Sequence, residues 1–509
     1  MAAETASFGQ TLSGYIDVVN GFVWGPPMLV LLLGTGLYLT VFLKMMPLRK
    51  IGFAFGELMK GRKPEGEGDV TPFGALMTAL SSTIGTGNIA GVAVAIAIGG
   101  PGALFWMWMT ALVGMATKFA EGVLAVQFRE IDADGRRVGG PMYYIKNGMG
   151  KSWIWLGGLF AFFGVMAGLG TGNAIQTAEV VRTVNETYGV EYWITGGVIA
   201  VLAGAVILGG IKRIANVASA LVPSMAGIYI IVGLVIVGMN ADAIPAALGN
   251  IFSSAFGFDA AAGGFSGALL MLAMQRGVAR GIFSNEAGQG SAPIAHAAAQ
   301  NDSPVDQGII AMLGTFIDTI LVCSITGLAI LTSGVIPAEC NAGLIALSGD
   351  LPQVCETGAR ITAEAFGAGM PFGDQFVTIA LALFAFTTIL GWSYYGERCA
   401  EYLLGVKIVL PFRIAWILMI LGATALLYAG DNITALMNTV WLTTDTLTGL
   451  MAAPNLIALL VLSPLVFKMT REYFARIEAG DGQAAAAEAA IQAGAEETGH
   501  RPDEDKSGQ

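Results

Sequence analysis

Long apolar runs, separated by short polar segments, occupy most of the sequence between residues 27 and 467. A helix needs about 20 mostly apolar residues to cross the hydrocarbon core of a lipid bilayer. Eleven segments reach or approach that length, so the pattern predicts an all-α polytopic membrane protein. We place the eleven helices at residues 27–46, 71–98, 102–128, 153–182, 192–211, 217–238, 264–299, 305–333, 373–402, 409–428 and 433–467.

Two of these segments are interrupted near the middle by glycines and polar residues. The second contains SSTIGTGN, from Ser81 to Asn88, and the seventh contains GIFSNEAGQG, from Gly281 to Gly290. Non-helical backbone at membrane depth is tolerated only where protein or an internal cavity satisfies its polar groups. Both interruptions are therefore expected to line a cavity, the alternative being that their glycines only let helices pack closely.

The places of the two interruptions predict an internal repeat. When the first helix is set aside, ten remain, and an interrupted helix begins each set of five. Sets of five face opposite ways across the membrane, as in inverted-repeat transporters, whose paired discontinuous helices form the substrate and ion site. We divide the chain into an N-terminal part with the first helix (1–70), two repeats (71–240 and 241–470) and an acidic tail (471–509) expected to be disordered.

Composition and charge agree with a membrane protein and give its orientation. Charged residues make up 12% of the chain, against about 25% in soluble proteins. Lys and Arg are retained on the cytoplasmic side, and only Arg182 and Arg360 fall in the loops opposite the basic set. This places the N-terminus outside and the C-terminus in the cytoplasm. The first 26 residues lack the basic region of a cleavable signal, which suits retention of the first helix in a bacterial plasma (inner) membrane.

The four cysteines are too few for a disulfide scaffold. Cys340 and Cys355 both fall in the long loop assigned to the outside, where a bridge is chemically permitted, although spacing alone cannot establish its geometry. Cys323 and Cys399 lie within helices and are expected to be packing residues.

Five stretches of the sequence resemble the alanine or glycine:cation symporter family. They are TPFGALMTALSSTIGTGNIAG from Thr71, GIFSNEAGQGSAP from Gly281, GPMYY from Gly140, GNAIQ from Gly172 and GWSYYG from Gly391. The resemblance covers about residues 15 to 470. It implies a LeuT-like five-plus-five inverted repeat with one extra N-terminal helix, which moves alanine or glycine with sodium by alternating access. It also implies that the third helix of each repeat completes the site.

Candidate substrate-binding residues lie on both interruptions and on these third helices. Main-chain groups at the start of a half-helix attract a carboxylate. The side chain of Gln176 offers donors and acceptors for an amino acid, although bonding to a neighbouring helix is its ordinary role. The bulk of Trp392 suits a limit to small side chains, with core packing as the alternative. The full set is Thr86, Gly87, Asn88, Gln176, Phe283, Ser284, Asn285 and Trp392.

A sodium site is expected where the ninth helix faces the first interruption. The hydroxyls of Thr387 and Thr388 are hard oxygen ligands, and carbonyls near Thr83 and Ile84 would complete the shell. Threonine bonding back to its own helix is the alternative role. Sodium is a co-transported ion here, so no cofactor is expected.

Ionisable residues at membrane depth are functional candidates by default because they are costly there. Lys118 and Glu121 are spaced to neutralise each other, and Arg276, Arg280 and Glu286 are candidates for a gate or brace around the second interruption. Glu179 and Asp318 leave a proton-coupled symporter open as an alternative. The complete set is Lys118, Glu121, Glu179, Arg276, Arg280, Glu286, Asp318 and Glu397.

Two other function classes receive weaker support. GFSG at Gly264 has the form of an intramembrane protease nucleophile, but Ser266 needs a base, and His296 is about thirty residues away. A channel is disfavoured because the sequence has no TVGYG-type filter and no ring of like charges. Metals, nucleotides and nucleic acid have no supporting motif, so the expected partners are a small amino acid, sodium and membrane lipid, with the oligomeric state open and no enzyme activity.

Overall fold

The computed structural model describes residues 8–63, 66–256, 266–301, 303–337, 340, 358–428 and 433–479. These residues are almost entirely helical, which confirms the predicted all-α membrane class. Their strands are the two of a small antiparallel hairpin, β1 (Glu130–Ile131) and β2 (Arg137–Val138), in which Glu130 lies opposite Val138. The hairpin lies in a loop between long helices and was not predicted from the sequence.

The helices up to residue 239 comprise an N-terminal group and the first set of five. Four of the short segments are not α-helical: η1, η2 and η4 are π-helical and η3 is a 3-10 turn. In chain order they are α1 (Phe8–Val23), α2 (Pro26–Phe42), α3 (Met46–Arg49), α4 (Ile51–Lys60), α5 (Pro72–Thr83), η1 (Gly87–Gly91), α6 (Val92–Gly99), α7 (Gly102–Gln127), α8 (Pro141–Tyr144), η2 (Ile145–Met149), η3 (Lys151–Trp153), α9 (Ile154–Ala167), η4 (Gly168–Ile175), α10 (Gln176–Tyr188), α11 (Tyr192–Ile207) and α12 (Gly210–Met239).

The second set of five follows, with η7 π-helical and η5 and η8 as 3-10 turns. In chain order the elements are η5 (Ala241–Ala243), α13 (Ile244–Ala255), α14 (Ser266–Asn285), α15 (Ala292–His296), α16 (Pro304–Thr315), η7 (Phe316–Cys323), α17 (Ser324–Ser333), α20 (Gly358–Gly369), α21 (Gly373–Leu404), η8 (Val406–Ile408), α22 (Val409–Leu426) and α23 (Ile433–Ala479).

Helices that are long and apolar enough to span a membrane overlap the predicted segments, although the first runs from Gly14 to Phe42 where 27–46 was predicted. Within the described residues, eight helices are long and apolar enough to cross a membrane, and the pair α5 and η1–α6, bent by 54°, makes a ninth. The two remaining predicted segments are α11, which has 16 residues, and α14–α15, which is interrupted. The count of eleven spans stays a prediction.

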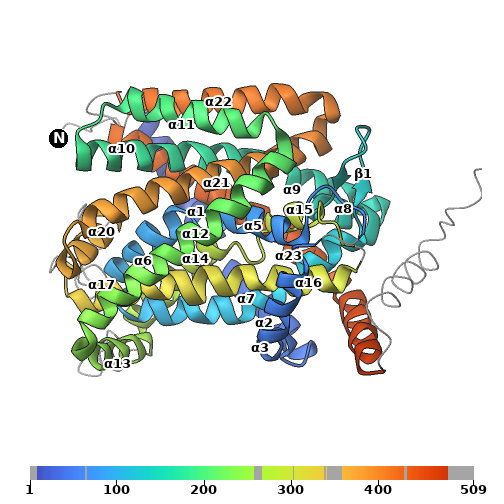
Figure 1. Ribbon diagram of the computed structural model, residues 1–509, viewed down its shortest axis with the longest axis horizontal. Helices are drawn as coiled ribbons and strands as arrows, with labels where there is room; N and C mark the ends of the chain where they lie inside the picture. Colours follow the sequence, from blue (N-terminus) through green and yellow to red (C-terminus); the bar gives the residue numbers. More distant parts are fainter. Residues whose placement is uncertain are drawn as a thin grey trace, which may run out of the picture.

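Corresponding helices of the two sets pack against each other. The broken helices meet where α14 contacts η1 and α6; α7 packs on α16, α9 on α21, and α11 on α22. Figure 1 shows α11 beside α22 along one side of the molecule and α7 beside α16 along the other. This pairing of first with first, second with second, third with third and fourth with fourth helices is the arrangement expected of a five-plus-five repeat.

Small residues allow the closest of these contacts. A side chain at Gly122 of α7 would meet the Cβ atom of Ala311 on α16 at 2.8 Å, and one at Gly114 would meet the Cβ atom of Ala287 at the same distance. Helices in lipid associate largely through such close packing, because lipid offers no hydrophobic driving force between them. The contact between Gly114 and Ala287 therefore holds the second interruption against α7 of the first repeat.

The predictions for the C-terminal tail and for the four cysteines have mixed outcomes. Helix α23 continues to Ala479, so residues 471–479 of the segment expected to be disordered are helical; residues 480–509 lie outside the described residues. Cys340 forms a disulfide, whereas Cys355 lies outside the described residues. Cys323 and Cys399 are free and buried, as expected for packing residues.

Candidate functional site

A cavity lies between the two interrupted helices. The cavity is narrow: the space between its lining atoms is about 300 Å³ with adjoining open solvent included, and about 20 Å³ of it can hold the centre of a water molecule. Six elements contribute to its wall: the first interruption, η4, α10, the second interruption with the end of α14, α21 and α23. The lining residues are Ser82, Thr83, Gly85, Thr86, Gly87, Thr171, Gln176, Phe283, Glu286, Gln289, Thr388, Trp392 and Thr448.

The first interruption is a short extended turn at the end of α5. The helix stops because Ile84 adopts φ −76° and ψ 92°, and the chain resumes a helical path at η1. The side chain of Asn88 stabilises the turn by accepting a hydrogen bond from the Gly85 amide at 2.9 Å. Thr86 places its amide 3.4 Å from the Gln176 side-chain oxygen, and its buried hydroxyl has no hydrogen-bond partner among the described residues.

The second interruption is a longer loop in which left-handed backbone occurs at three positions. Glu286 has φ 55°, Gly288 φ 85° and Gly290 φ 83°; two of these positions carry glycine, for which this conformation is not strained. Asn285 accepts a hydrogen bond from the Ala287 amide at 2.9 Å, and Gln289 donates to the Ile282 carbonyl at 3.0 Å. Side chains of the loop therefore satisfy much of its own backbone.

Asp318 on η7 ties the two interruptions together. One carboxylate oxygen accepts from the Asn88 amide nitrogen at 2.7 Å, and the other accepts from the Ser284 hydroxyl at 2.8 Å and the Thr319 hydroxyl at 2.7 Å. A buried carboxylate with three donors is well satisfied, so this group is a structural junction between the repeats.

The third helices of the two sets meet across the cavity, as the resemblance implies. Gln176 begins α10 and Trp392 lies on α21, and both side chains line the wall. A side chain at Gly172 of η4 would lie 2.3 Å from the Trp392 Cβ atom, so only glycine permits this approach of η4 and α21. The indole nitrogen of Trp392 donates to Glu286 at 2.8 Å.

The oxygen atoms expected to bind sodium are only partly together. The Thr388 hydroxyl lies 3.5 Å from the Ile84 carbonyl, next to the first interruption, and Thr83 also lines the cavity. The Thr387 hydroxyl instead donates to the Phe384 carbonyl and lies 3.8 Å from the Met225 sulfur on α12. Among the described residues there is no group of three His, Cys, Asp or Glu side chains that could hold a metal ion.

The structure brings together some of the predicted substrate residues and places others behind the wall. Thr86, Gly87, Gln176, Phe283 and Trp392 line the cavity. The side chains of three others point away from the cavity and form hydrogen bonds within the protein. Asn88 and Ser284 bond to Asp318, and Asn285 bonds to Thr319.

Several lining residues were not proposed from the sequence. Thr171 and Thr448 sit in helices without any local signal, and their hydroxyls lie 3.2 Å apart. Gln289 lies inside the GIFSNEAGQG stretch, so the interruption itself could have indicated it. Glu286 was singled out only as part of a gate or brace.

The ionisable residues at membrane depth brace the same region. The Glu121 carboxylate accepts hydrogen bonds from the backbone amide of Gly290 at 3.2 Å and from the side-chain nitrogen of Asn455 at 2.7 Å. The buried ammonium of Lys118 has no hydrogen-bond partner among the described residues, but it acts electrostatically on Glu121, as their spacing predicts. The Arg280 guanidinium lies 5.6 Å from the centre of the Phe283 ring, a cation–π contact beside the cavity.

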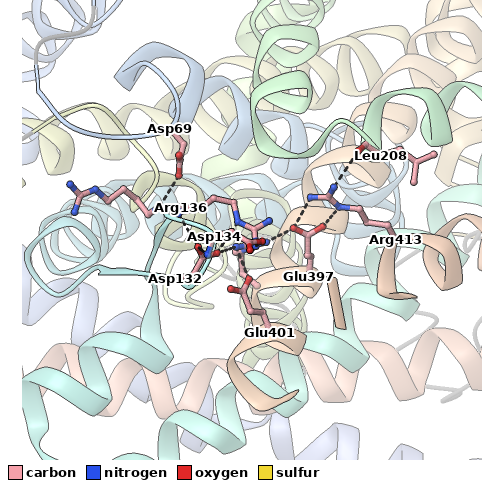
Figure 2. Close-up of polar contacts among 10 residues, drawn as sticks. Asp69, Asp132, Asp134, Arg136, Leu208, Glu397, Glu401 and Arg413 are labelled. Atoms are coloured by element: carbon pink, nitrogen blue, oxygen red, sulfur yellow. Dashed lines mark hydrogen bonds and ion pairs between the residues drawn. The ribbon is translucent and has the colours of Figure 1, made fainter. Parts of the chain in front are cut away.

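A second polar cluster lies at the end of the molecule that carries β1 and α8 (Figure 1). Figure 2 shows Asp132 of the hairpin loop beside the carboxyl end of α21. Arg398 of α21 lies 3.4 Å from Asp132, 2.5 Å from Glu397 and 2.6 Å from Glu401. Arg413 of α22 pairs with Glu397 at 2.5 Å. These contacts join the hairpin to α21 and α22.

The network continues from the hairpin to the segment before α5. The Arg137 amide donates to the Asp69 carboxylate at 2.8 Å. Burial acts to raise the pKa of Asp132, but hydrogen bonds from the backbone and side chain of Arg136 outweigh it and lower the pKa below its ordinary value. Asp132 is therefore a charged partner of Arg398 and Arg136 near neutral pH.

Comparison with known proteins places the chain in a family. The family model described as the sodium:alanine symporter family matches residues 9–487. The sodium/alanine symporter AgcS of Methanococcus maripaludis is 50% identical over 90% of this chain and 96% of its own length. The probable sodium/glutamine symporter GlnT of Bacillus subtilis is 35% identical over 92% of both chains.

Among solved structures, MhsT in complex with L-phenylalanine aligns with 80% of this chain and 99% of its own at 13% identity, with a TM-score of 0.47. That likeness is too remote to carry an argument about the site. The match of the family model over nearly the whole sequence, together with two interrupted helices that enclose a polar cavity, leads to one assignment. The chain belongs to the sodium:alanine symporter family.

Proposed function

We propose that this protein takes up a small neutral amino acid, alanine or glycine, together with sodium by alternating access. The observation that carries the proposal is the chemistry of the cavity wall. Among the described lining residues, Glu286 is the one charged side chain, and hydrogen bonds from Trp392 and Ser291 occupy both of its oxygens. Main-chain groups and uncharged side chains then suit a zwitterion without net charge. Family membership and the named activity of AgcS support the same substrate class.

The first interruption is the proposed binding site of the substrate's charged groups. The amide of Thr86 and the main chain of Gly87 would face the carboxylate, and Gln176 would exchange its present bond to the Thr86 amide for one to the substrate. Phe283 and Trp392 would enclose the side chain. Asn88, Ser284 and Asn285 support the proposed site from behind because their side chains bond to Asp318 and Thr319.

Sodium is proposed to bind between the Thr388 hydroxyl and the Ile84 carbonyl, with Thr83 nearby. These are hard oxygen donors at a place where α5 has ended and its carbonyls are free of helical partners. Thr387 would join the shell only after turning away from Met225. An electrochemical sodium gradient, aided by about 2.3 kcal/mol per charge per 100 mV of membrane potential, would drive accumulation.

The proposed cycle also needs one side of the cavity to be closed at a time. With the N-terminus outside, the cluster of Asp132, Glu397, Arg398 and Arg413 lies on the cytoplasmic side of a bacterial plasma membrane. Its ion pairs connect the hairpin with α21 and α22, so they would close the inner path until the repeats rock. This orientation rests on the distribution of Lys and Arg along the sequence.

The alternatives have less support. Asp318 is held by three donors, which favours a bracing role over a proton carrier. The ring nitrogen Nδ1 of His296 pairs with the Gln307 side-chain amide at 2.7 Å, and Nε2 has no hydrogen-bond partner among the described residues, so no serine hydroxyl there is placed to give this base a proton. Glutamine is the second candidate substrate, because GlnT is named for it.

Uptake by proteoliposomes tests the proposal. Labelled alanine, glycine and glutamine would be offered with an inward gradient of sodium, potassium or protons. We expect concentrative uptake of alanine or glycine with the sodium gradient alone, and weaker uptake at low substrate concentration in Gln176→Ala because its KM is raised. Uptake driven equally by protons without sodium, or uptake of glutamine alone, would contradict the proposal.

A further inference from the structure

Glu286 occupies an unusual place in the cavity wall. Its backbone is left-handed, with φ 55°, which is uncommon for a residue other than glycine, and its side chain is 2% exposed. Such strained positions persist only where the surroundings hold them, and they gather at functional sites. The carboxylate accepts from the Trp392 indole nitrogen at 2.8 Å and from the Ser291 hydroxyl. This links the second interruption to the aromatic wall on α21.

Trp392 is restrained on its other sides by packing. Because residue 172 is glycine, the Trp392 Cβ atom has room that a side chain there would fill. The Tyr395 ring lies 5.6 Å from the Trp392 ring in an edge-on contact. Packing of this kind limits where the indole can go, but the hydrogen bond to Glu286 selects its orientation. The direction of the ring decides how much of the cavity it fills.

Lys118 is a buried basic side chain of α7 in the same region. Its ammonium is buried, has no hydrogen-bond partner among the described residues, and acts electrostatically on both Glu286 and Glu121. A buried charge without an opposite charge nearby is costly. A charged carboxylate is also the stronger acceptor for an indole N–H.

We propose that Glu286 is a positioning residue that holds Trp392 in the orientation that caps the cavity, and thereby sets the upper limit on the size of the transported side chain. The inference rests on the proposed amino-acid transport and adds the residue that determines its selectivity. Glu286 acts through Trp392 and makes no contact with the substrate's own charges.

The test is a size series measured on the full-length protein in proteoliposomes. Sodium-driven alanine uptake would be inhibited with glycine, 2-aminobutyrate, norvaline and leucine in the wild type, Glu286→Gln, Glu286→Ala, Trp392→Phe and the double variant Glu286→Ala/Trp392→Phe. Ser291→Ala is the matched control, because it removes the other hydrogen bond to the same carboxylate.

We expect Glu286→Ala to raise the alanine KM and to strengthen inhibition by norvaline, each about tenfold, with kcat changed less than about threefold. Glu286→Gln keeps an oxygen that accepts from the indole, so it should retain the wild-type size order, as should Ser291→Ala. Trp392→Phe removes the same bond from the other side and should resemble Glu286→Ala. The double variant should then be no more permissive than either single variant.

Four outcomes would overturn the inference. An equal loss of kcat/KM for every solute in Glu286→Ala would make Glu286 a general brace. An unchanged size order in Trp392→Phe would remove Trp392 as the cap, and this variant decides the matter if Glu286→Ala elutes as an aggregate. If the wild type takes up no amino acid of the series, the proposed function falls, and the inference falls with it; normal wild-type uptake with unaltered size selectivity in the variants refutes the inference alone.

Discussion

Neighbouring threonines on α21 present their hydroxyls to different surroundings. Consecutive residues of an α-helix point about 100° apart, so Thr388 faces the first interruption while Thr387 faces Met225 on α12. Both hydroxyls also donate to the Phe384 carbonyl. The pair therefore separates a hydroxyl that lines the cavity from one that faces a neighbouring helix.

Replacement of Thr388 by alanine tests the proposed sodium site. We expect the sodium concentration for half-maximal uptake to rise about tenfold, as for loss of one charge-assisted ligand. The adjacent Thr387→Ala is the control and should change that concentration less than about twofold. Equal effects of the two substitutions would place the ion elsewhere.

Replacement of Asn88 and replacement of Gln176 are expected to affect different properties, stability in the first case and substrate affinity in the second. Asn88 bonds to Gly85 and Asp318 within the scaffold, so Asn88→Ala should lower the free energy of unfolding by about 2 kcal/mol or more, because buried partners lose their bonds. Gln176→Ala should mainly raise the alanine KM. Thermal melting in detergent and uptake kinetics measure the two effects, and a stable Asn88→Ala protein with a raised KM would make Asn88 a substrate ligand.

Among the elements, the two interrupted helices were predictable because glycines and polar residues stand out within apolar runs. Their residues SSTIGTGN and GIFSNEAGQG mark the places where α5 and α14 end. The direction of individual side chains was not predictable. Asp318 satisfies Asn88 and Ser284 from helices far apart in sequence, and no local pattern reveals such a partner. Thr171 and Thr448 reach the cavity for the same reason, through packing alone.

The contact between η4 and α21 depends on one glycine. Gly172→Ala would place a Cβ atom 2.3 Å from that of Trp392, so the helices must separate or the indole must move. We expect uptake to fall about tenfold or more, since small displacements at a site have large kinetic effects. Gly197→Ala on α11 is the control, because nothing lies within 4 Å of the added atom. Normal uptake by Gly172→Ala would show that the contact tolerates expansion.

At the scale of the whole molecule, the two five-helix sets are joined at the cavity by Asp318 and at the hairpin end by ion pairs. The order of apolar segments predicts two sets of five, and corresponding helices of these sets pack against each other. The hairpin β1–β2 and its contact with α21 could not be predicted. Short polar loops have no hydrophobic periodicity from which a strand could be predicted. Arg398 and Asp132 are 266 residues apart in the sequence, so no local pattern indicates their contact.

The ion pairs at the hairpin end make stability depend on pH. Because the pKa of Asp132 is lowered in the folded protein, its contribution is present above its unfolded value of about 3.9 and is lost as the pH falls through the lower folded value. Melting temperatures measured between about pH 5 and pH 3 should fall less steeply in Asp132→Asn than in the wild type. Asp134→Asn, at an exposed carboxylate that pairs with Arg136, should follow the wild type; identical slopes for all three proteins would contradict the role of Asp132.

The hydrogen bond between Asn88 and Asp318 spans 230 residues, and this separation bears on how the protein is made. The ribosome delivers the first interrupted helix to the membrane long before it has synthesised η7. Until then the side-chain nitrogen of Asn88 lacks its carboxylate partner, although the side-chain oxygen can already accept from the Gly85 amide. An unpaired polar group is costly in hydrocarbon, so this part of the first half is completed only when the second half has been translated. A chain that stops at residue 240 lacks the carboxylate that joins its interruption to the second one.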